Sequence, residues 1–316
     1  MNLQHVVTRK FDDTDHDYDQ RDTLLYALSL GLGSDPLDSD ELPYVYEGLA
    51  RRPLQVVPTQ AVILGWQPFW HDEPASAIDW KRIVHGEQHV CLHAPLATAA
   101  RVRAKHRLVG VQDKGAGRGA VLQVDTELFD RVRGTHLASL SSLQFLRGDG
   151  GCGSWDAGMT PAIAPPMTPV TTPVWTPART PATSPVLAPI ADDAPPVASI
   201  DLRTSPQAAL LYRAASRDWM PIHADPGVAR EAGFERPISH GLNNLGLACR
   251  AILKICAPGR PERLRAIAVR FVQPGLPGDT VRVELFDGGA GRLQFRATAV
   301  ERGVRLLDRG SCTLEA

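Results

Sequence analysis

The sequence predicts an α+β fold in which antiparallel strands wrap one central helix. The helix is expected to begin at Gly241, because apolar residues recur after it at steps of three and four. The chain beyond the helix alternates apolar and polar residues between the turn phrases PGLPGD, DGGAG and ERG, which is typical of antiparallel strands. Residues 82–150 predict further short strands broken by glycine clusters, which favour a curved sheet. The apolar positions of the helix are Leu242, Leu245, Gly246, Cys249, Ile252, Leu253 and Cys256.

Residues 154–197 differ in composition from the rest of the chain. Proline recurs there at about every fourth residue, with threonine and alanine between. Such a segment is expected to be extended and semi-rigid without a packed core. We interpret it as a linker between an N-terminal half, 1–153, and a C-terminal half, 198–316. Near the start of the C-terminal half, in SPQAALLYRAASRD, we expect Leu210, Leu211 and Tyr212 to be strand or core residues. Recognition by a partner that binds proline-rich segments is the less favoured alternative. A chain of 316 residues is long enough for two domains.

The N-terminal half opens with the acidic phrase FDDTDHDYDQRD, which we interpret as a solvated face. The next phrase, TLLYALSLGLG, predicts a short helix that ends at Gly31 and Gly33. The phrases ELPYVYEGL and LQVVPTQAVIL then predict the first strand and a short buried segment. Later, HGEQ at His85 and DKGAGRG at Asp113 have the pattern of two hairpin turns with surface charge. The second phrase lacks the strand-to-helix context of a nucleotide-binding loop.

Composition excludes several classes of protein. The net charge of −1 leaves no basic stripe for nucleic acid. No apolar run is long enough to span a membrane, and the first residues have no signal-peptide core. The five cysteines are scattered, and none has metal-ligand spacing with another cysteine or with a histidine. We therefore expect a reduced, cytoplasmic chain.

The strongest candidate for chemistry is the stretch from Asp218 to Gly241. Asp218 and His223 lie five residues apart, and Pro221 and Pro226 exclude a regular helix through them. A constrained loop can direct a carboxylate and an imidazole, the commonest proton-transfer groups, into one pocket. Gly241 then places unpaired N–H groups of a helix start nearby, where they can hold charge on a carbonyl oxygen. The alternative is that Asp218 is a helix cap and His223 a loop histidine.

These phrases resemble the MaoC-like, or hydratase 2, family. The family reads S-G-D-x-N-P-L-H-x-D-P and then A-G-F-x-x-P-I-x-H-G-L, where this chain has SRDWMPIHADP and AGFERPISHGL. The resemblance implies that Asp218 and His223 are catalytic and that Gly241 forms the oxyanion hole. Arg217 replaces the family's glycine. Met220 replaces an asparagine that helps hold water and substrate, so the substrate or the rate can differ here.

The resemblance extends to the N-terminal half and to the strand after the helix. RDTLLYALSLGLG and ELPYVYE are similar to the start of the two-domain hydratase 2. HGEQ and DKGAGRG are similar to its substrate-side motifs, which implies that His85, Gly86 and Lys114 contact an acyl-CoA. RFVQPGLPGDT is similar to R-F-x-x-P-x-x-P-G-x-T, which implies that Phe271 lines the acyl pocket and also allows it to be a core residue. The implied fold is a double hot-dog whose first half has lost its central helix, leaving room for a bulky acyl group.

The implied activity is (R)-specific hydration of a trans-2-enoyl-CoA, or dehydration of the 3-hydroxyacyl-CoA. The coenzyme A thioester is the substrate, and no metal or redox cofactor is implied, because the thioester already acidifies the alpha position. A homodimer is expected, because hot-dog folds usually pair their sheets. Two alternatives stay open: a hydratase for a bulky or unusual acyl-CoA, and a catalytically weak acyl-CoA-binding protein.

Overall fold

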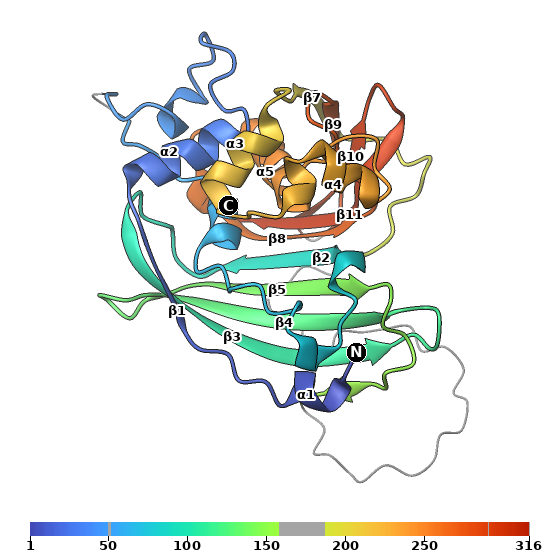
Figure 1. The fold of residues 1–316 in the computed structure, drawn as a ribbon. Helices are drawn as coiled ribbons and strands as arrows, with labels where there is room; N and C mark the ends of the chain where they lie inside the picture. Colours follow the sequence, from blue (N-terminus) through green and yellow to red (C-terminus); the bar gives the residue numbers. More distant parts are fainter. Residues whose placement is uncertain (50–51, 158–186, 290, 316) are drawn as a thin grey trace.

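A computed structural model describes residues 1–49, 52–157, 187–289 and 291–315 (Figure 1). Its strands form one antiparallel sheet of eleven strands in the order β1-β3-β4-β5-β2-β8-β11-β10-β9-β7, with β6 paired to β3. The strands are β1 Thr14–Tyr18, β2 Ile83–Leu92, β3 Ala100–Asp113, β4 Ala120–Asp130, β5 His136–Leu146, β6 Trp155–Asp156, β7 Ala198–Arg203, β8 Leu264–Phe271, β9 Thr280–Asp287, β10 Arg292–Ala299 and β11 Val304–Leu314. The α-helices are α1 Leu3–Val7, α2 Gln20–Ser29, α3 Ala208–Ser216, α4 Pro226–Glu231 and α5 Gly241–Cys256. The predicted α+β class is therefore confirmed.

The sheet consists of two similar halves that join at β2 and β8. From each outer edge inward, the N-terminal half runs β1-β3-β4-β5-β2 and the C-terminal half runs β7-β9-β10-β11-β8. The junction pairs Glu87 with Arg270 and Val90 with Ile267 in antiparallel register. Both halves thus share one continuous hydrogen-bonded sheet rather than two separate ones.

Helix α5 fills the concave side of the C-terminal half. Every residue from Leu242 to Leu253 is buried, and the helix packs against β7, β8, β9 and β11. In Figure 1, α2, α3 and α5 gather over this half, while β3, β4 and β5 extend away from them. The predicted helix from Gly241 is confirmed, and so are the antiparallel strands of residues 82–150 and of the region after the helix.

The N-terminal half has no counterpart of α5 among its described residues. Between α2 and β2 they form only short 3-10 turns, namely η1 Leu42–Tyr44, η2 Pro58–Ile63, η3 Pro74–Ser76 and η4 Trp80–Arg82. All six residues of η2 are buried, and η2 packs against both α5 and β2. The expected loss of the first central helix is confirmed for the described part of this half.

Two expectations for the first 65 residues need correction. The phrases ELPYVYEGL and LQVVPTQAVIL contain η1 and η2 and no strand in their described residues. Pro43 is the second residue of η1, and Pro58 is the first residue of η2. A proline has no N–H to donate to a neighbouring strand, so both positions disfavour a strand. The first strand is instead β1, inside the acidic phrase read as a solvated face. The helix predicted over TLLYALSLGLG is confirmed as α2, and Gly31 and Gly33 follow it with φ of 75° and 74°.

Strand β1 is an edge strand whose charges are matched by its neighbour. Asp15 lies opposite Arg103 in register, and their side chains form two hydrogen bonds of 2.7 and 3.0 Å. Tyr18, on the same strand, is buried in the core. The acidic phrase is therefore exposed on one side, as expected, but it is also part of the sheet.

The segment before Asp218 also differs from expectation. Leu210, Leu211 and Tyr212 were predicted to be strand or core residues, and they lie on helix α3. Tyr212 is a core residue at 1% exposure, whereas Leu210 is 54% exposed. The strand interpretation is wrong for all three, because one face of α3 packs on α2 and the other faces solvent.

Most of the predicted linker, 154–197, lies outside the described residues, which omit 158–186. At its start, Trp155–Asp156 forms β6 and pairs with Val111 and Gly110 of β3. At its end, the N–H of Val197 donates to the carbonyl of Leu285, one residue before β7 begins. Both described ends of this segment therefore contact the half of the sheet next to them.

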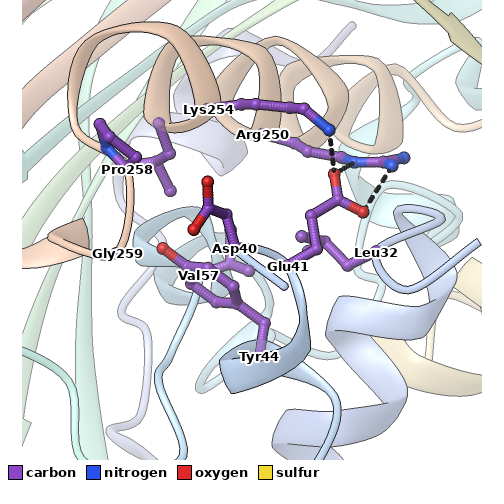
Figure 2. Close-up of a pocket in the computed structure, with 10 residues that line it drawn as sticks. Leu32, Asp40, Glu41, Tyr44, Val57, Arg250, Lys254, Pro258 and Gly259 are labelled. Atoms are coloured by element: carbon purple, nitrogen blue, oxygen red, sulfur yellow. Dashed lines mark hydrogen bonds and ion pairs between the residues drawn. The ribbon is translucent and has the colours of Figure 1, made fainter. Parts of the chain in front are cut away.

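A buried ion pair joins α5 to the N-terminal half (Figure 2). Arg250 donates to both oxygens of Glu41, at 2.6 and 2.8 Å, and to the carbonyl of Leu30 at 3.0 Å. Arg250 is 6% exposed and Glu41 3% exposed. On the next turn of α5, Lys254 pairs with Asp38 and lies 3.6 Å from Glu41. These contacts hold the segment after α2 against the central helix.

Replacing Arg250 by methionine should destabilise the protein strongly, because Glu41 would stay buried without its main partner. Loss of one member of a buried pair costs about 3–5 kcal/mol, and we expect the lower end because Lys254 remains near Glu41. Urea unfolding measures the change. The control is Asp201→Asn, which breaks the exposed pair with Arg282 and should cost less than about 1 kcal/mol. Equal costs for the two variants would contradict this prediction.

Candidate active site

Asp218 lies just after helix α3, in a turn that its own carboxylate helps to form. The preceding residue, Arg217, has the left-handed conformation with φ of 60° and ψ of 21°, and its N–H donates to Arg213. A side chain in this region costs roughly 1–2 kcal/mol, which explains why a glycine suits this position in the family motif. The N–H of Asp218 donates to Ser216 Oγ at 3.2 Å, and Asp218 Oδ1 accepts from the N–H of Met220 at 3.1 Å.

His223 ends the 3-10 turn η5, Pro221–His223. Its Nδ1 lies 2.8 Å from the carbonyl oxygen of Ile238. A carbonyl only accepts, so Nδ1 carries the proton and Nε2 keeps a lone pair. Burial lowers the pKa of His223, and the nearby Asp218 charge opposes this only in part. The imidazole is thereby held in the form of a neutral base.

The backbone of Met220 connects these two groups. Its N–H donates to Asp218, as described above, and its carbonyl accepts from the N–H of His223 at 3.3 Å. The Met220 side chain is half-buried. The position therefore fixes the spacing between Asp218 and His223 through the main chain, whichever side chain it carries.

His240 is a third group at this site that the sequence analysis did not single out. Its ring stacks on His223 with centroids 3.6 Å apart, and its Nε2 lies 3.9 Å from Asp218 Oδ2. His240 is 2% exposed, and neither ring nitrogen has a hydrogen-bond partner among the described residues. Burial, followed by the charge of His223, lowers the pKa of His240 to about 2. Its place directly before Gly241 in the motif was the only signal for it.

Asp218, His223 and His240 form one compact cluster. One side-chain oxygen or nitrogen from each lies within 4.8 Å of those of the other two. Asp218 is partly accessible, with 19% of its side chain exposed. A carboxylate and a neutral imidazole at this separation can exchange a proton through one water molecule.

Gly241 begins helix α5, so its N–H is one of those for which the helix itself offers no acceptor. A Cβ atom at this position would lie 3.2 Å from Cδ1 of Phe271. The absence of a side chain thus lets the aromatic ring approach the start of the helix. The helix dipole adds a partial positive charge at the same place.

Phe271 connects this helix start to the N-terminal half of the sheet. It is the last residue of β8, and its ring centroid lies 4.7 Å from that of His85 on β2. His85 Nε2 lies 3.1 Å from the carbonyl of Glu87 and 3.2 Å from Ser142 Oγ. Burial lowers the pKa of His85 to about 4. Pairing of β2 with β8 therefore brings His85, Phe271 and Gly241 together.

The HGEQ phrase is not a hairpin turn, contrary to the pattern-based interpretation. It lies inside β2, where the register with β5 shifts between His85 and Glu87. Gly86 occupies this bulge, and a Cβ there would lie 3.2 Å from the carbonyl oxygen of Leu143. The bulge turns the strand at the position of the predicted substrate contact.

Lys114 lies in the hairpin between β3 and β4, so the turn predicted for DKGAGRG is confirmed. The carboxylate of Asp113 accepts N–H groups of Gly115, Gly151 and Gly153, each at 2.8 Å, which fixes the hairpin. Lys114 Nζ donates to Gln112 at 2.7 Å. Burial and then the charge of Arg270 lower the pKa of Lys114. Arg270 precedes Phe271, so Lys114 is at the same end of β8.

Comparisons with known proteins agree with this arrangement. Residues 189–308 match the MaoC like domain, and residues 16–148 match the MFE-2 hydratase 2 N-terminal domain. The chain is 33% identical to peroxisomal enoyl-CoA hydratase 2 of Arabidopsis thaliana over 313 residues, covering 97% of this chain and 94% of the relative. It is 32% identical to 3-hydroxyacyl-thioester dehydratase Y of Mycobacterium tuberculosis, covering 89% and 86%.

Solved structures show the same fold. A MaoC-like dehydratase from Phytophthora capsici superposes with a TM-score of 0.78 at 27% identity, covering 100% of this chain and 99% of that one. A Mycobacterium tuberculosis protein described as a double hotdog fold superposes with a TM-score of 0.50 at 16% identity, covering 97% and 96%, and supports the fold alone.

The two halves, each with its five-stranded share of one sheet, define a double hot-dog protein. This chain belongs to the MaoC-like dehydratase family, in its hydratase 2 form with two halves, and is accordingly a hydro-lyase. The resemblance and the fold predicted from the motifs are both confirmed. In the described part of the chain, no helix is long and apolar enough to cross a membrane.

The burial of His240 predicts a specific dependence of stability on pH. Its pKa is lowered in the folded state, so the unfolded chain binds the extra proton first as pH falls. The free energy of unfolding should therefore decrease below the ordinary histidine pKa of about 6.5. Between pH 7.5 and pH 5 we expect the wild type to lose about 2 kcal/mol more than His240→Phe. Urea unfolding at both pH values measures this. The same loss in both proteins would show that His240 is not a buried neutral group.

Proposed function

We propose that the chain catalyses reversible hydration of a trans-2-enoyl-CoA to a (3R)-3-hydroxyacyl-CoA. The observation that carries this proposal is the orientation of His223, whose Nδ1–H is tied to Ile238 so that Nε2 is left as a base in the same cluster as Asp218. Relatives named enoyl-CoA hydratase 2 and 3-hydroxyacyl-thioester dehydratase support the reaction class. The (R) configuration and the roles of individual residues are our proposal.

In the proposed step, Asp218 and His223 share one water molecule. His223 Nε2 accepts a proton from this water while its oxygen bonds to C3 of the enoyl group. In the proposed enoyl-CoA complex Asp218 holds the one proton of the pair, and it gives this proton to C2 as the C2–C3 double bond becomes single. A proton then returns from His223 to Asp218, which restores the pair. One side-chain nitrogen of His223 and one carboxylate oxygen of Asp218 lie within 4.8 Å of each other.

Gly241 is proposed to stabilise the charge that develops during this step. Negative charge builds on the thioester oxygen as the oxygen of water bonds to C3. The N–H of Gly241 has no acceptor within its helix and can donate to that oxygen, supported by the dipole of α5. One such donor contributes on the order of 3 kcal/mol to transition-state stabilisation. The thioester itself makes C2 acidic, so the proposed step needs no metal or redox cofactor.

The N-terminal half is proposed to hold the rest of the acyl-CoA. His85 and Gly86 are on the bulge of β2, and Phe271 packs between His85 and Gly241, so these residues can line the acyl group next to the reacting atoms. Lys114 can donate to a polar part of coenzyme A as a mobile charge. The half-buried Met220 replaces an asparagine of the family motif, so we propose that it influences which acyl group is accepted. A homodimer and a cytoplasmic location stay predictions.

Substitution of the acid and the base should remove most of the activity. Asp218→Asn and His223→Gln are each expected to lower kcat by about 10²–10⁴-fold. The assay follows loss of the enoyl-thioester absorbance with crotonyl-CoA and with a longer trans-2-enoyl-CoA, and chiral analysis identifies the product. The matched control is Asp225→Ser, because Asp225 only caps helix α4 and serine also caps well. The control should keep nearly wild-type kcat.

The outcomes separate the proposed function from its alternatives. Full activity of His223→Gln, or a (3S) product from the wild type, would contradict the mechanism. Turnover of bulky acyl-CoA esters with none of crotonyl-CoA would favour an unusual acyl substrate. Calorimetric binding of CoA esters without turnover of any ester would favour an acyl-CoA-binding protein.

The pair should also give a bell-shaped pH dependence of kcat/KM. The proposed step needs one proton on the pair, so activity falls at high pH when that proton is lost and at low pH when His223 gains a second one. Because burial lowers the pKa of His223, the acid limb should have its midpoint below about 6.5. Measurement of kcat/KM from pH 4 to pH 10 tests this. An acid limb centred above 6.5, or none at all, would argue against His223 as the base.

A further inference from the structure

A second cluster of ionisable side chains lies in the N-terminal half, away from the proposed active site. It consists of His93, Glu127 and His136, and one ligand-type atom from each lies within 4.8 Å of the other two. His136 Nε2 is 2.7 Å from Glu127 Oε2, and His93 Nε2 is 2.9 Å from Ser139 Oγ, whose hydroxyl also donates to Glu127. His93 follows the end of β2, eight residues beyond His85. A strand of that length spans roughly 25 Å.

A β-bulge in β5 builds this cluster. Leu128 pairs with Ala138 and Phe129 pairs with His136, so Leu137 is an extra residue in the ladder. The bulge places His136 on the same side of the sheet as Ser139, which lies opposite Glu127. It also exposes the carbonyl of Leu137, which accepts the N–H of His93 at 2.8 Å. One irregularity thus brings together residues from β4, from β5 and from the segment after β2.

The rings of the two histidines are held in place by their neighbours. His136 stacks on Phe129 with centroids 4.8 Å apart and planes inclined by 20°. The ring of His93 lies 4.2 Å from that of His136. Such packing pre-orients side chains in the way that metal sites require.

We propose that His93, Glu127 and His136 bind a divalent transition-metal ion of the zinc class. Two imidazoles and one carboxylate are a recognised zinc ligand set, and the nitrogen ligands favour zinc, cobalt or nickel over magnesium and calcium. The hydroxyl of Ser139 or a water can complete the coordination. On binding, the Nε2 protons that His136 shares with Glu127 and His93 shares with Ser139 move to the Nδ1 atoms, so both rings become ligands without losing a proton.

The ion would stabilise the start of the N-terminal half. The segment that begins at His93 accepts two hydrogen bonds from earlier elements. The hydroxyl of Tyr18 donates to the carbonyl of Ala97 at 2.7 Å, and that of Thr23 donates to the carbonyl of Thr98 at 3.0 Å. Fixing His93 to β4 and β5 would therefore also secure β1 and α2. This proposal departs from the sequence analysis, which expected no metal because the thioester itself makes C2 acidic and because no cysteine has metal-ligand spacing.

The test uses tag-free, full-length protein stripped with a chelator. Calorimetric titration with ZnCl2 should give one ion per chain, and CoCl2 should produce the visible absorption of cobalt with nitrogen and oxygen ligands. Zinc should raise the unfolding temperature, while MgCl2 at the same concentration should leave it unchanged. No zinc binding at 100-fold excess over protein, or equal effects of zinc and magnesium, would overturn the proposal.

Variants locate the ion. His136→Ala and His93→Ala should each weaken zinc binding by more than about 100-fold, since even residues that only support metal ligands contribute 10–100-fold. Circular dichroism confirms that each variant is folded. The matched control is Asp218→Asn, which removes one member of the other cluster and should bind zinc like the wild type. Unchanged binding in His136→Ala, or its loss only in Asp218→Asn, would overturn the assignment.

Discussion

The pairing of β2 with β8 is the interaction on which the rest of the structure depends. It makes one sheet out of two halves and places Glu87 opposite Arg270. Because Phe271 is the next residue on β8, its ring reaches both His85 of the first half and Gly241 at the start of α5. Neither half contains this arrangement alone. The proposed substrate-side residues of one half and the proposed proton-transfer residues of the other are therefore brought together only through this junction.

The two halves of the sheet are covered by different elements, and the cover of the N-terminal half includes an ion pair that is costly to desolvate. Helix α5 fills the C-terminal half, while the described residues between α2 and β2 make only 3-10 turns. The buried pair of Arg250 and Glu41 fastens this less regular segment to α5. A buried ion pair is expensive to desolvate, so its value here is to fix position rather than to add much stability. It keeps the segment around Glu41 and η1 against the helix without a second helix taking up space.

Helices and strands could be predicted from the sequence where the apolar residues recur with one regular spacing. The steps of three and four after Gly241 predicted a helix and the alternation after it predicted antiparallel strands, and both were confirmed, although α5 is buried on all sides from Leu242 to Leu253. Strand β1 was missed because its acidic residues are matched by arginines about 90 positions away, such as Arg103. His240 was missed because its stacking on His223 depends on a turn that brings two separate segments together. Such long-range contacts leave no local period.

The two departures from the family motif, Arg217 and Met220, occur at positions whose main-chain groups set the local geometry. Arg217 takes the left-handed conformation that the motif glycine suits, and its N–H still closes α3. Met220 uses its N–H for Asp218 and its carbonyl for His223. The spacing of Asp218 and His223 is therefore maintained although the side chains at positions 217 and 220 differ from those of the motif. What the chain lacks at position 220 is the amide side chain of the family motif. We therefore propose that the departures bear on the substrate or the rate rather than on the spacing of the pair.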